Sequence, residues 1–257
     1  MNLLEEKRKI LNHASYDDTG VFAGKLGRLC QTIYLYNRDQ PSEKDPTLGG
    51  RISKTLHATG LSEKFLSSVF LGNEVHGAGL QSIVFDRGKV VEKYLVMPLG
   101  KLAITIGLFE EYENTCLVAA SSVFGDMVPG TKIHRTRLAM RPLGGVGTLG
   151  IVQKKITNGY GLFSTHGLKK VSASKQNNND TVFDNTRMFL RLNAQFKEEY
   201  GADIDVCSGN VLVLPDDSIK IIDYDPDLPS NYLEIPRYKI SAEHRSYWIR
   251  KMSEVTR

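Results

Sequence analysis

Asp203-Ile-Asp-Val-Cys-Ser-Gly-Asn-Val-Leu-Val-Leu-Pro-Asp-Asp-Ser-Ile-Lys-Ile-Ile-Asp223 is the stretch of sequence that decides the fold. An apolar run is followed by Pro-Asp-Asp-Ser and then by a second, mostly apolar run. This order predicts a strand, a tight turn and another strand. Such a hairpin brings Asp205, Asn210 and Asp223 to one end of a two-stranded ribbon.

These three polar residues suit the binding of a divalent cation and a phosphate donor. Mg²⁺ takes oxygen ligands, usually one or two carboxylates together with phosphate oxygens. A further carboxylate can accept the proton of an attacking hydroxyl. The alternative is a surface hairpin in which Asp and Asn serve only the turns.

The composition is that of an ordinary globular protein. The chain has 257 residues, of which 41% are hydrophobic and 24% are charged. This length is enough for one large domain or for a two-lobed one. The net charge of +4 is too small to predict nucleic-acid binding, so we expect no DNA partner. No apolar run approaches membrane-spanning length, and no pattern indicates an oligomeric state.

The cysteines bear on the compartment. Cys30, Cys116 and Cys207 are widely separated and odd in number, which predicts no disulfide framework and no zinc site. We therefore expect a reducing, cytoplasmic compartment. The start of the chain is charged, unlike a signal peptide. Secretion into a host cell without a cleaved signal would leave no trace in this pattern.

The apolar pattern of the first hundred residues changes from helical spacing to strand spacing near residue 73. Residues 1–72 are predicted to form a helical extension, because apolar residues recur there at helical spacing. This extension either packs on the rest or binds a partner, and its apolar stripes favour packing. From residue 73 onward the pattern predicts strands, with a hairpin at 76–97.

Two features of this predicted hairpin point to phosphate binding. Gly77 and Gly79 carry no side chain that would block the approach of the backbone to a phosphate. On the second strand, Val91 and Lys93 are two residues apart and share a face. The alternative for Lys93 is an ordinary exposed strand lysine.

The spacing Asp-x-x-x-x-Asn, followed by a hairpin and Ile222-Asp-Tyr224, resembles the catalytic loop and metal-binding motif of the protein-kinase-like fold. The local form Asp205-Val-Cys-Ser-Gly-Asn210 is most similar to the compact secreted effector kinases of pathogenic bacteria. The resemblance implies that Asp205 orients the acceptor hydroxyl. It also implies that Asn210 and Asp223 hold Mg²⁺.

The resemblance assigns further residues to an ATP site. A helix predicted at about 102–121 would carry the glutamate that pairs with Lys93, for which we choose Glu113 and, second, Glu110. Lys93 would hold the phosphates of ATP. The residues implied to cover those phosphates are Gly77, Ala78, Gly79 and Ser82.

A second glycine motif, Gly145-Val-Gly-Thr-Leu-Gly150, matches the Gly-x-Gly-x-x-Gly pattern of nucleotide loops. No strand–turn–helix pattern surrounds it, and too few residues separate it from Asp205 for the rest of an ATP lobe. We interpret Gly144 and Gly145 as the end of a link between two lobes. Residues 140–143, with Met140 and Pro142, would then face the adenine.

The chain also departs from the family. Asp203 stands where kinases commonly have a histidine, and Cys207 stands where a polar or basic residue often meets the phosphate. Asp223-Tyr-Asp225 lacks the usual glycine. Only 34 residues follow Asp223, which predicts a truncated large lobe.

Together these expectations describe an α+β, two-lobed protein-kinase-like fold with a truncated C-terminal lobe. Residues 1–72 would be the helical extension, 73–143 the small ATP lobe and 144–257 the large lobe, with a lysine- and asparagine-rich insertion at 151–179. The implied function is an ATP- and Mg²⁺-dependent Ser/Thr protein kinase acting as a bacterial effector in virulence. Its implied partners are a protein substrate and a host protein that also activates it. The alternatives are a small-molecule or lipid kinase, and a pseudokinase that acts as a binding module.

Overall fold

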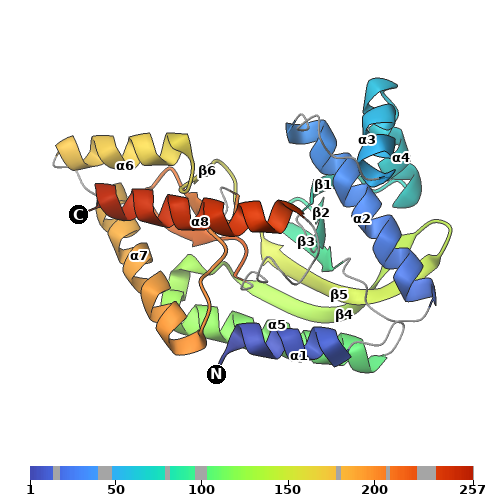
Figure 1. The fold of residues 1–257 in the computed structure, drawn as a ribbon, viewed down its shortest axis with the longest axis horizontal. Helices are drawn as coiled ribbons and strands as arrows, with labels where there is room; N and C mark the ends of the chain where they lie inside the picture. The colour runs from blue at the N-terminus through green and yellow to red at the C-terminus, as the bar shows by residue number, and fades with distance from the viewer. Residues whose placement is uncertain are drawn as a thin grey trace. The chain divides into compact units, whose positions relative to one another are not determined.

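A computed structural model describes residues 1–13, 18–39, 48–78, 82–95, 103–177, 181–206, 209–224 and 236–256. It shows a mixed α+β protein, as the sequence predicts. The chain divides into two compact units, labelled by element in Figure 1. Unit 1 contains Met1–Lys9, Tyr112–Gly130 and Ile156–Arg257, and unit 2 contains Ile10–Glu111 and Thr131–Lys155.

The centre of unit 2 is an antiparallel sheet of five strands (Figure 1). The strand order is β1-β2-β3-β5-β4, and the first predicted strand of the hairpin at 76–97 is in fact two paired strands. The pairing of β2 with β3 joins Ser82 to Leu95 and Asp86 to Val91. The strands are β1 (Val75–Ala78), β2 (Ser82–Asp86), β3 (Val90–Leu95), β4 (Thr131–Met140) and β5 (Gly144–Lys154).

One face of this sheet is covered by helices from the first part of the chain. The helices against the sheet are α2 (Asp18–Asp39) and α4 (Ser62–Val69), whereas α3 (Leu48–Ala58) packs on these two helices. The buried residues of α2 and α4 share one core with the sheet, so this part of residues 1–72 packs on the strands. The members of this core include Cys30, Ile33, Leu66, Phe70, Ile83, Phe85, Leu138 and Met140.

The opposite face of the sheet packs against α5 (Ala103–Phe124), whose first part belongs to unit 2. Ile106 and Phe109 of this helix lie in one cluster with Leu95, Leu149 and Ile151. A Cβ atom on Gly147 would stand 3.0 Å from the side chain of Ile106. The glycine motif at residues 145–150 lies within strand β5, and its Gly147 leaves room for the side chain of Ile106. This agrees with the interpretation of the motif as something other than a phosphate loop.

The boundary predicted between 143 and 144 falls inside the β4–β5 hairpin. Met140 pairs with Gly144, and this register continues to Thr131 paired with Gln153. The strand β5 also pairs with β3, so residues 144–154 belong to the sheet. The chain passes from unit 2 to unit 1 only after Lys155.

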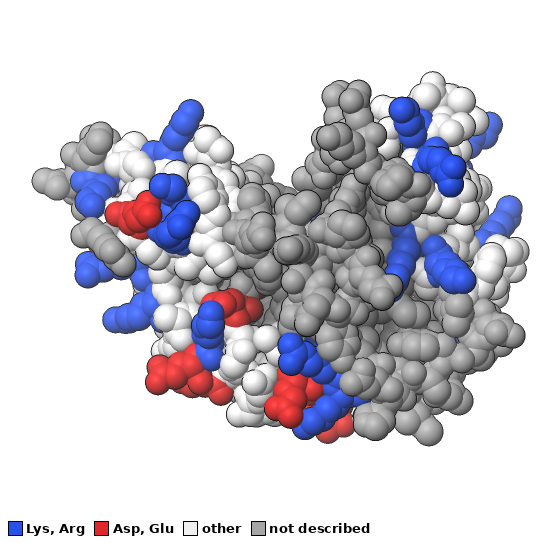
Figure 2. All heavy atoms as spheres, in the orientation of Figure 1, with Lys and Arg blue, Asp and Glu red and all other residues white. Residues whose placement is uncertain are grey.

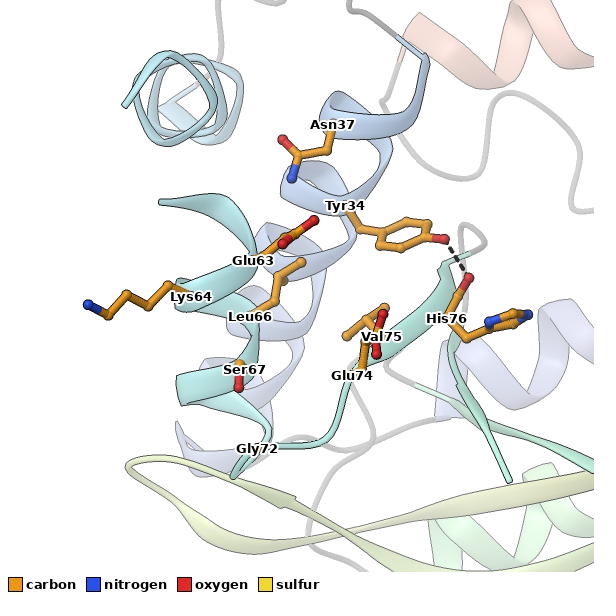
Figure 3. A pocket seen from close by; sticks show the side chains of 10 residues that line it. All are labelled: Tyr34, Asn37, Glu63, Lys64, Leu66, Ser67, Gly72, Glu74, Val75 and His76. Atoms are coloured by element: carbon orange, nitrogen blue, oxygen red, sulfur yellow. Dashed lines mark hydrogen bonds between the residues drawn. The ribbon is translucent and has the colours of Figure 1, made fainter. Parts of the chain in front are cut away.

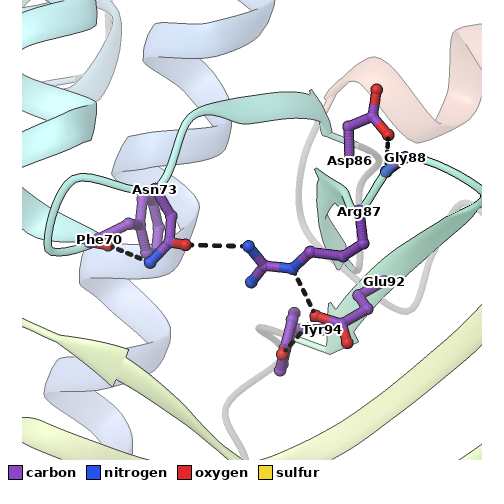
Figure 4. Close-up of polar contacts among 7 residues, drawn as sticks. All are labelled: Phe70, Asn73, Asp86, Arg87, Gly88, Glu92 and Tyr94. Atoms are coloured by element: carbon purple, nitrogen blue, oxygen red, sulfur yellow. Dashed lines mark hydrogen bonds and ion pairs between the residues drawn. The ribbon is translucent and has the colours of Figure 1, made fainter.

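A polar network joins the β2–β3 turn to the end of α4 (Figure 4). Arg87 donates to Glu92 Oε2 at 2.9 Å and to Asn73 Oδ1 at 3.0 Å. Asn73 in turn donates to the carbonyl oxygen of Phe70, and Tyr94 donates to Glu92 Oε2. Because Arg87 uses its planar group for two partners at once, it holds the turn against the helix end.

Unit 1 is built around packed aromatic rings. Phe163, Phe189 and Phe196 are fully buried, and Phe124 at the end of α5 lies within 5.7 Å of both Phe189 and Phe196 between ring centroids. The burial of each such ring stabilises the fold by roughly 1.5–3 kcal/mol. The elements of unit 1 include the start of α1 (Leu3–His13), the 3₁₀ helix Gly125–Met127, β6 (Tyr160–Gly161), α6 (Thr165–Asn177), α7 (Thr181–Tyr200), β7 (Val211–Val213), β8 (Ile219–Ile221) and α8 (Pro236–Val255).

The predicted insertion at 151–179 is largely ordered secondary structure. It contains the end of β5, the strand β6 and the helix α6. Lys169 and Lys170 are exposed on α6, and basic side chains gather over this part of unit 1 in Figure 2. Lys175 is engaged, because its Nζ donates to the carbonyl oxygen of Val255 at the end of α8. Such a contact offsets the unpaired carbonyls of a helix terminus.

Within the described ranges, no helix is both long enough and apolar enough to cross a bilayer. Cys30 and Cys116 are buried free thiols. Burial raises the pKa of Cys30 to about 12, which makes this thiol a core group and not a nucleophile. Cys207 lies outside the described residues.

Candidate functional site

The hairpin predicted at 211–222 is present in unit 1. β7 and β8 pair antiparallel with Val211 opposite Ile221 and Val213 opposite Ile219, and all four side chains are buried. The amide of Ile222 donates to the carbonyl oxygen of Asn210 at 2.6 Å, which extends the ribbon by one pair. Asn210 therefore lies at the same end of the hairpin as Asp223, as the sequence predicts.

Asp205 and Asn210 are in direct contact. The Nδ2 atom of Asn210 donates to Asp205 Oδ2 at 2.9 Å, and both side chains are half-buried. The Oδ1 atom of Asn210 has no hydrogen-bond partner among the residues that the structure describes. Because the amide nitrogen is occupied by Asp205, the amide oxygen is the atom left for a cation.

Asp223 follows β8 and is half-buried, whereas Tyr224 beside it is buried. The donors at this hairpin end are carboxylate and amide oxygens, which are the ligands that Mg²⁺ prefers. In the described part of the chain, no group of three or more His, Cys, Asp or Glu side chains could hold a metal. The oxygen atoms of Asn210 and Asp223 are of the kind that fits Mg²⁺, which often takes its other ligands from phosphate and water. Asp225 lies outside the described residues.

The sequence did not single out the residues that hold the chain before Asp205. Asn193 on α7 bonds both to Asp203 and to the amide of Ile204. Lys197, one turn further along α7, pairs with the other oxygen of Asp203 at 2.8 Å. One sequence feature could have drawn attention to Asn193, because it is a polar residue that shares a helical face with the apolar Phe189 and Phe196.

Lys93 is buried in unit 2, with an exposed fraction of 9%. It lies on the third strand of the sheet, opposite Ile151 of β5 and on the same face as Leu95. That face is the one against which α5 packs. The alternative of an ordinary exposed strand lysine is therefore wrong, and a lysine buried to this extent is normally paired.

The two glutamates considered as partners of Lys93 differ. Arg135 donates through Nε to Glu110 Oε2 at 2.5 Å, so Glu110 has a partner in the neighbouring strand. Glu113 is 2% exposed and lies on the helical stripe that also carries Ile106 and Phe109. Lys93 belongs to unit 2 and Glu113 to unit 1. Their predicted pairing stays a prediction.

The described residues that were predicted to cover the phosphates lie at the end of β1 and the start of β2, and α2 contacts both strands. Tyr34 donates to the carbonyl oxygen of His76 at 2.5 Å, and Gln31 donates to that of Ser82 at 3.2 Å. Gly77 and Ala78 are residues of β1, opposite Val84 and Ile83. Gly79 lies outside the described residues.

Met140 and Pro142 do not lie in a link between the units. Met140 is 2% exposed and belongs to the core beneath α2 and α4. Pro142 follows a cis peptide bond in the turn between β4 and β5. The expected contacts of Met140 and Pro142 with adenine assumed that the sheet had ended by residue 143. Because the sheet continues to residue 154, the reason for this assignment is lost.

Unit 2 has a groove that the sequence did not predict. It has a volume of about 640 Å³ and is lined by residues of α2, α4 and the start of β1. Figure 3 shows lining residues of both kinds, the charged Glu63, Lys64 and Glu74 and the apolar Leu66 and Val75. Neither glutamate has an ion pair or hydrogen bond to another described residue.

No protein-family model matches the chain, and no curated protein matches it either. A functional assignment therefore depends on the chemistry of the residues described above.

Proposed function

We propose that the chain is an ATP- and Mg²⁺-dependent phosphotransferase of the protein-kinase-like fold, and specifically a Ser/Thr protein kinase that acts as a bacterial effector. The observation that carries the proposal is the contact of Asn210 with Asp205 at the end of the β7–β8 hairpin. It joins a carboxylate suited to accept a proton to an amide oxygen suited to hold a cation.

Three further observations support the proposal. Lys93 is a buried lysine on the third strand of the sheet, which is where kinases carry the lysine that binds phosphate oxygens. The helix that follows this strand carries the buried Glu113, as the resemblance implies. The strands β1 and β2 flank a loop with glycine at its start.

In this mechanism each residue acts by position and charge. Lys93 binds the phosphate oxygens of ATP, and Asp205 orients the acceptor hydroxyl and accepts its proton. Asn210 and Asp223 would hold Mg²⁺, which when bound neutralises charge on the phosphates.

The proposal is tested by incubating the purified chain with γ-labelled ATP and Mg²⁺, with and without host-cell lysate. Asp205→Ala and Asp223→Ala are assayed in parallel, with Asp184→Ala, an exposed residue of α7, as the matched control. Label on protein that depends on Asp205 and Asp223 supports the kinase. Label confined to lipids or small molecules favours the alternative substrate class, and the absence of both ATP binding and label ends the enzyme proposal.

A second candidate is a binding module, and the groove of unit 2 favours it. Two carboxylates without partners in the described residues line this groove, so a basic peptide fits its charge. Ser67→Trp would fill the groove, whereas Ser68→Trp on the exposed side of α4 would not. A panel of basic peptides that binds the wild type and Ser68→Trp but not Ser67→Trp supports this candidate. Equal binding to all three chains contradicts it.

A further inference from the structure

The amide side chain of Asn193 is buried in the middle of α7, with an exposed fraction of 4%. Its neighbours on that face of the helix, Phe189 and Phe196, are fully buried aromatic residues. A buried amide without hydrogen bonds is unfavourable in an apolar environment. The placement of a polar residue here therefore calls for specific partners.

The oxygen and the nitrogen of this side-chain amide both form hydrogen bonds to the segment directly before Asp205. Oδ1 of Asn193 accepts from the backbone amide of Ile204 at 3.0 Å. Nδ2 of Asn193 donates to Asp203 Oδ1 at 3.3 Å. The second oxygen of Asp203 accepts from Lys197 Nζ at 2.8 Å. The helix α7 thus holds residues 203 and 204 by three hydrogen bonds.

The direction of Asp205 follows from this attachment. Ala202, Ile204 and Val206 are buried, whereas Asp203 and Asp205 are half-buried, so the side chains alternate as in an extended segment. Because α7 fixes the backbone amide of Ile204, and because successive side chains of an extended segment point to opposite sides, the side chain of Asp205 points away from the buried side that Ile204 occupies. Asn210 contacts the same carboxylate from the other end of the loop.

We propose that Asn193 is a positioning residue for Asp205, and that it acts through its hydrogen bonds to Asp203 and to the amide of Ile204. This inference rests on the proposed function, because it assigns Asn193 to the orientation of the proposed base. The pair of Asn193 and Asp203 does not touch substrate. It sets where the carboxylate of Asp205 stands.

The test exchanges the two partners. Asn193→Asp places a second carboxylate 3.3 Å from Asp203 and removes the donor. Asp203→Asn alone leaves one oxygen at residue 203 for two donors, Asn193 Nδ2 and Lys197 Nζ, and turns an NH₂ group toward one of them. In the double variant, an aspartate at 193 still accepts from Ile204 and also accepts from an asparagine at 203. We expect kcat for ATP turnover with Mg²⁺ and water as acceptor to fall by roughly 10–100-fold in each single variant. The double variant should return to within about threefold of the wild type.

Two readouts separate positioning from general stability. The KM for ATP should stay within about twofold in all variants, because Asp203 and Asn193 act on the acceptor side. Hydrogen exchange at the Ile204 amide should be fast in Asn193→Ala and slow again in the double exchange variant. Lys197→Met removes the exposed partner of Asp203 without touching the buried amide, and should lower kcat by a few-fold.

Several outcomes would overturn the inference. An active wild type whose kcat is unchanged in Asn193→Asp and in Lys197→Met would contradict it, and so would a double variant as slow as the single ones. A wild type without ATP turnover would instead overturn the proposed function, and the positioning role with it. Exchange at Ile204 would then still report whether the attachment to α7 exists.

Discussion

The side-chain amide of Asn210 donates a hydrogen bond of 2.9 Å to the carboxylate of Asp205, across the loop that precedes the β7–β8 hairpin. Residues 207 and 208 of this loop lie outside the described residues, but both of its ends are placed. The contact gives the carboxylate a defined orientation and leaves the amide oxygen of Asn210 for another partner. The most direct prediction concerns this carboxylate.

Asp205→Asn keeps the shape of the side chain and removes its capacity to accept a proton at neutral pH. We expect kcat for phosphate transfer to fall by roughly 10²–10⁴-fold, the usual contribution of a general base. The free energy of unfolding should change little, since the site is half-buried. Steady-state kinetics beside urea denaturation measure both quantities. An Asp205→Asn enzyme with wild-type kcat would remove Asp205 from the mechanism.

Lys93→Met removes the buried charge of β3 and keeps a side chain of similar length. If Lys93 binds phosphate oxygens, the affinity for ATP should fall by roughly tenfold or more, because a charge-assisted contact is lost. Lys89→Met is the matched control, since Lys89 is exposed and lies in the turn directly before β3. Titration calorimetry with ATP compares the two. Equal affinities in both variants would contradict the assignment.

The network of Figure 4 predicts a pH dependence of stability. The hydrogen bond from Arg87 holds the pKa of the Glu92 carboxyl below its ordinary value. A carboxyl of this kind stabilises the fold above its unfolded pKa of about 4.3, and this stabilisation is lost as the pH falls through the folded pKa. Glu92→Gln should therefore lower the free energy of unfolding by up to about 1 kcal/mol at pH 7.

The difference between wild type and Glu92→Gln should shrink as the pH is lowered below about 4. Urea denaturation at a series of pH values measures it. Glu74→Gln is the control, because Glu74 is exposed and has no ion pair or hydrogen bond to another described residue. A difference that grows on acidification would have the wrong sign for this network.

Gly167 is the glycine with the least room in the described structure. A Cβ atom there would stand 2.1 Å from the carbonyl oxygen of Leu162, which is backbone and cannot move aside cheaply. We expect Gly167→Ala to destabilise unit 1 by roughly 3 kcal/mol, near the upper end for overpacked sites. Gly130→Ala meets no atom within 4 Å and should leave the stability close to that of the wild type. Thermal and urea denaturation measure the free energy of unfolding of both variants. Equal stabilities of Gly167→Ala and Gly130→Ala would contradict the prediction.

Features that depend on nearby residues were predictable from the sequence. The helix Thr181–Tyr200 ends directly before Gly201, which adopts a positive φ of 72° that favours glycine. The β7–β8 hairpin was predictable because its turn residues and both strands lie within a few residues of one another. The boundary at residue 143 was not, because strand β5 is held by β3, which is distant in the sequence.

The sequence by itself determined the hairpin that places Asn210 beside Asp205, since the spacing and the turn chemistry are local. Tertiary structure alone decided that Gly145–Gly150 forms a strand under α5, that Lys93 is buried, and that Asn193 reaches the chain before Asp205. The physical reason is that apolar periodicity states which face of an element is buried, but not which distant element covers it. That choice depends on the free energy of burying both faces together.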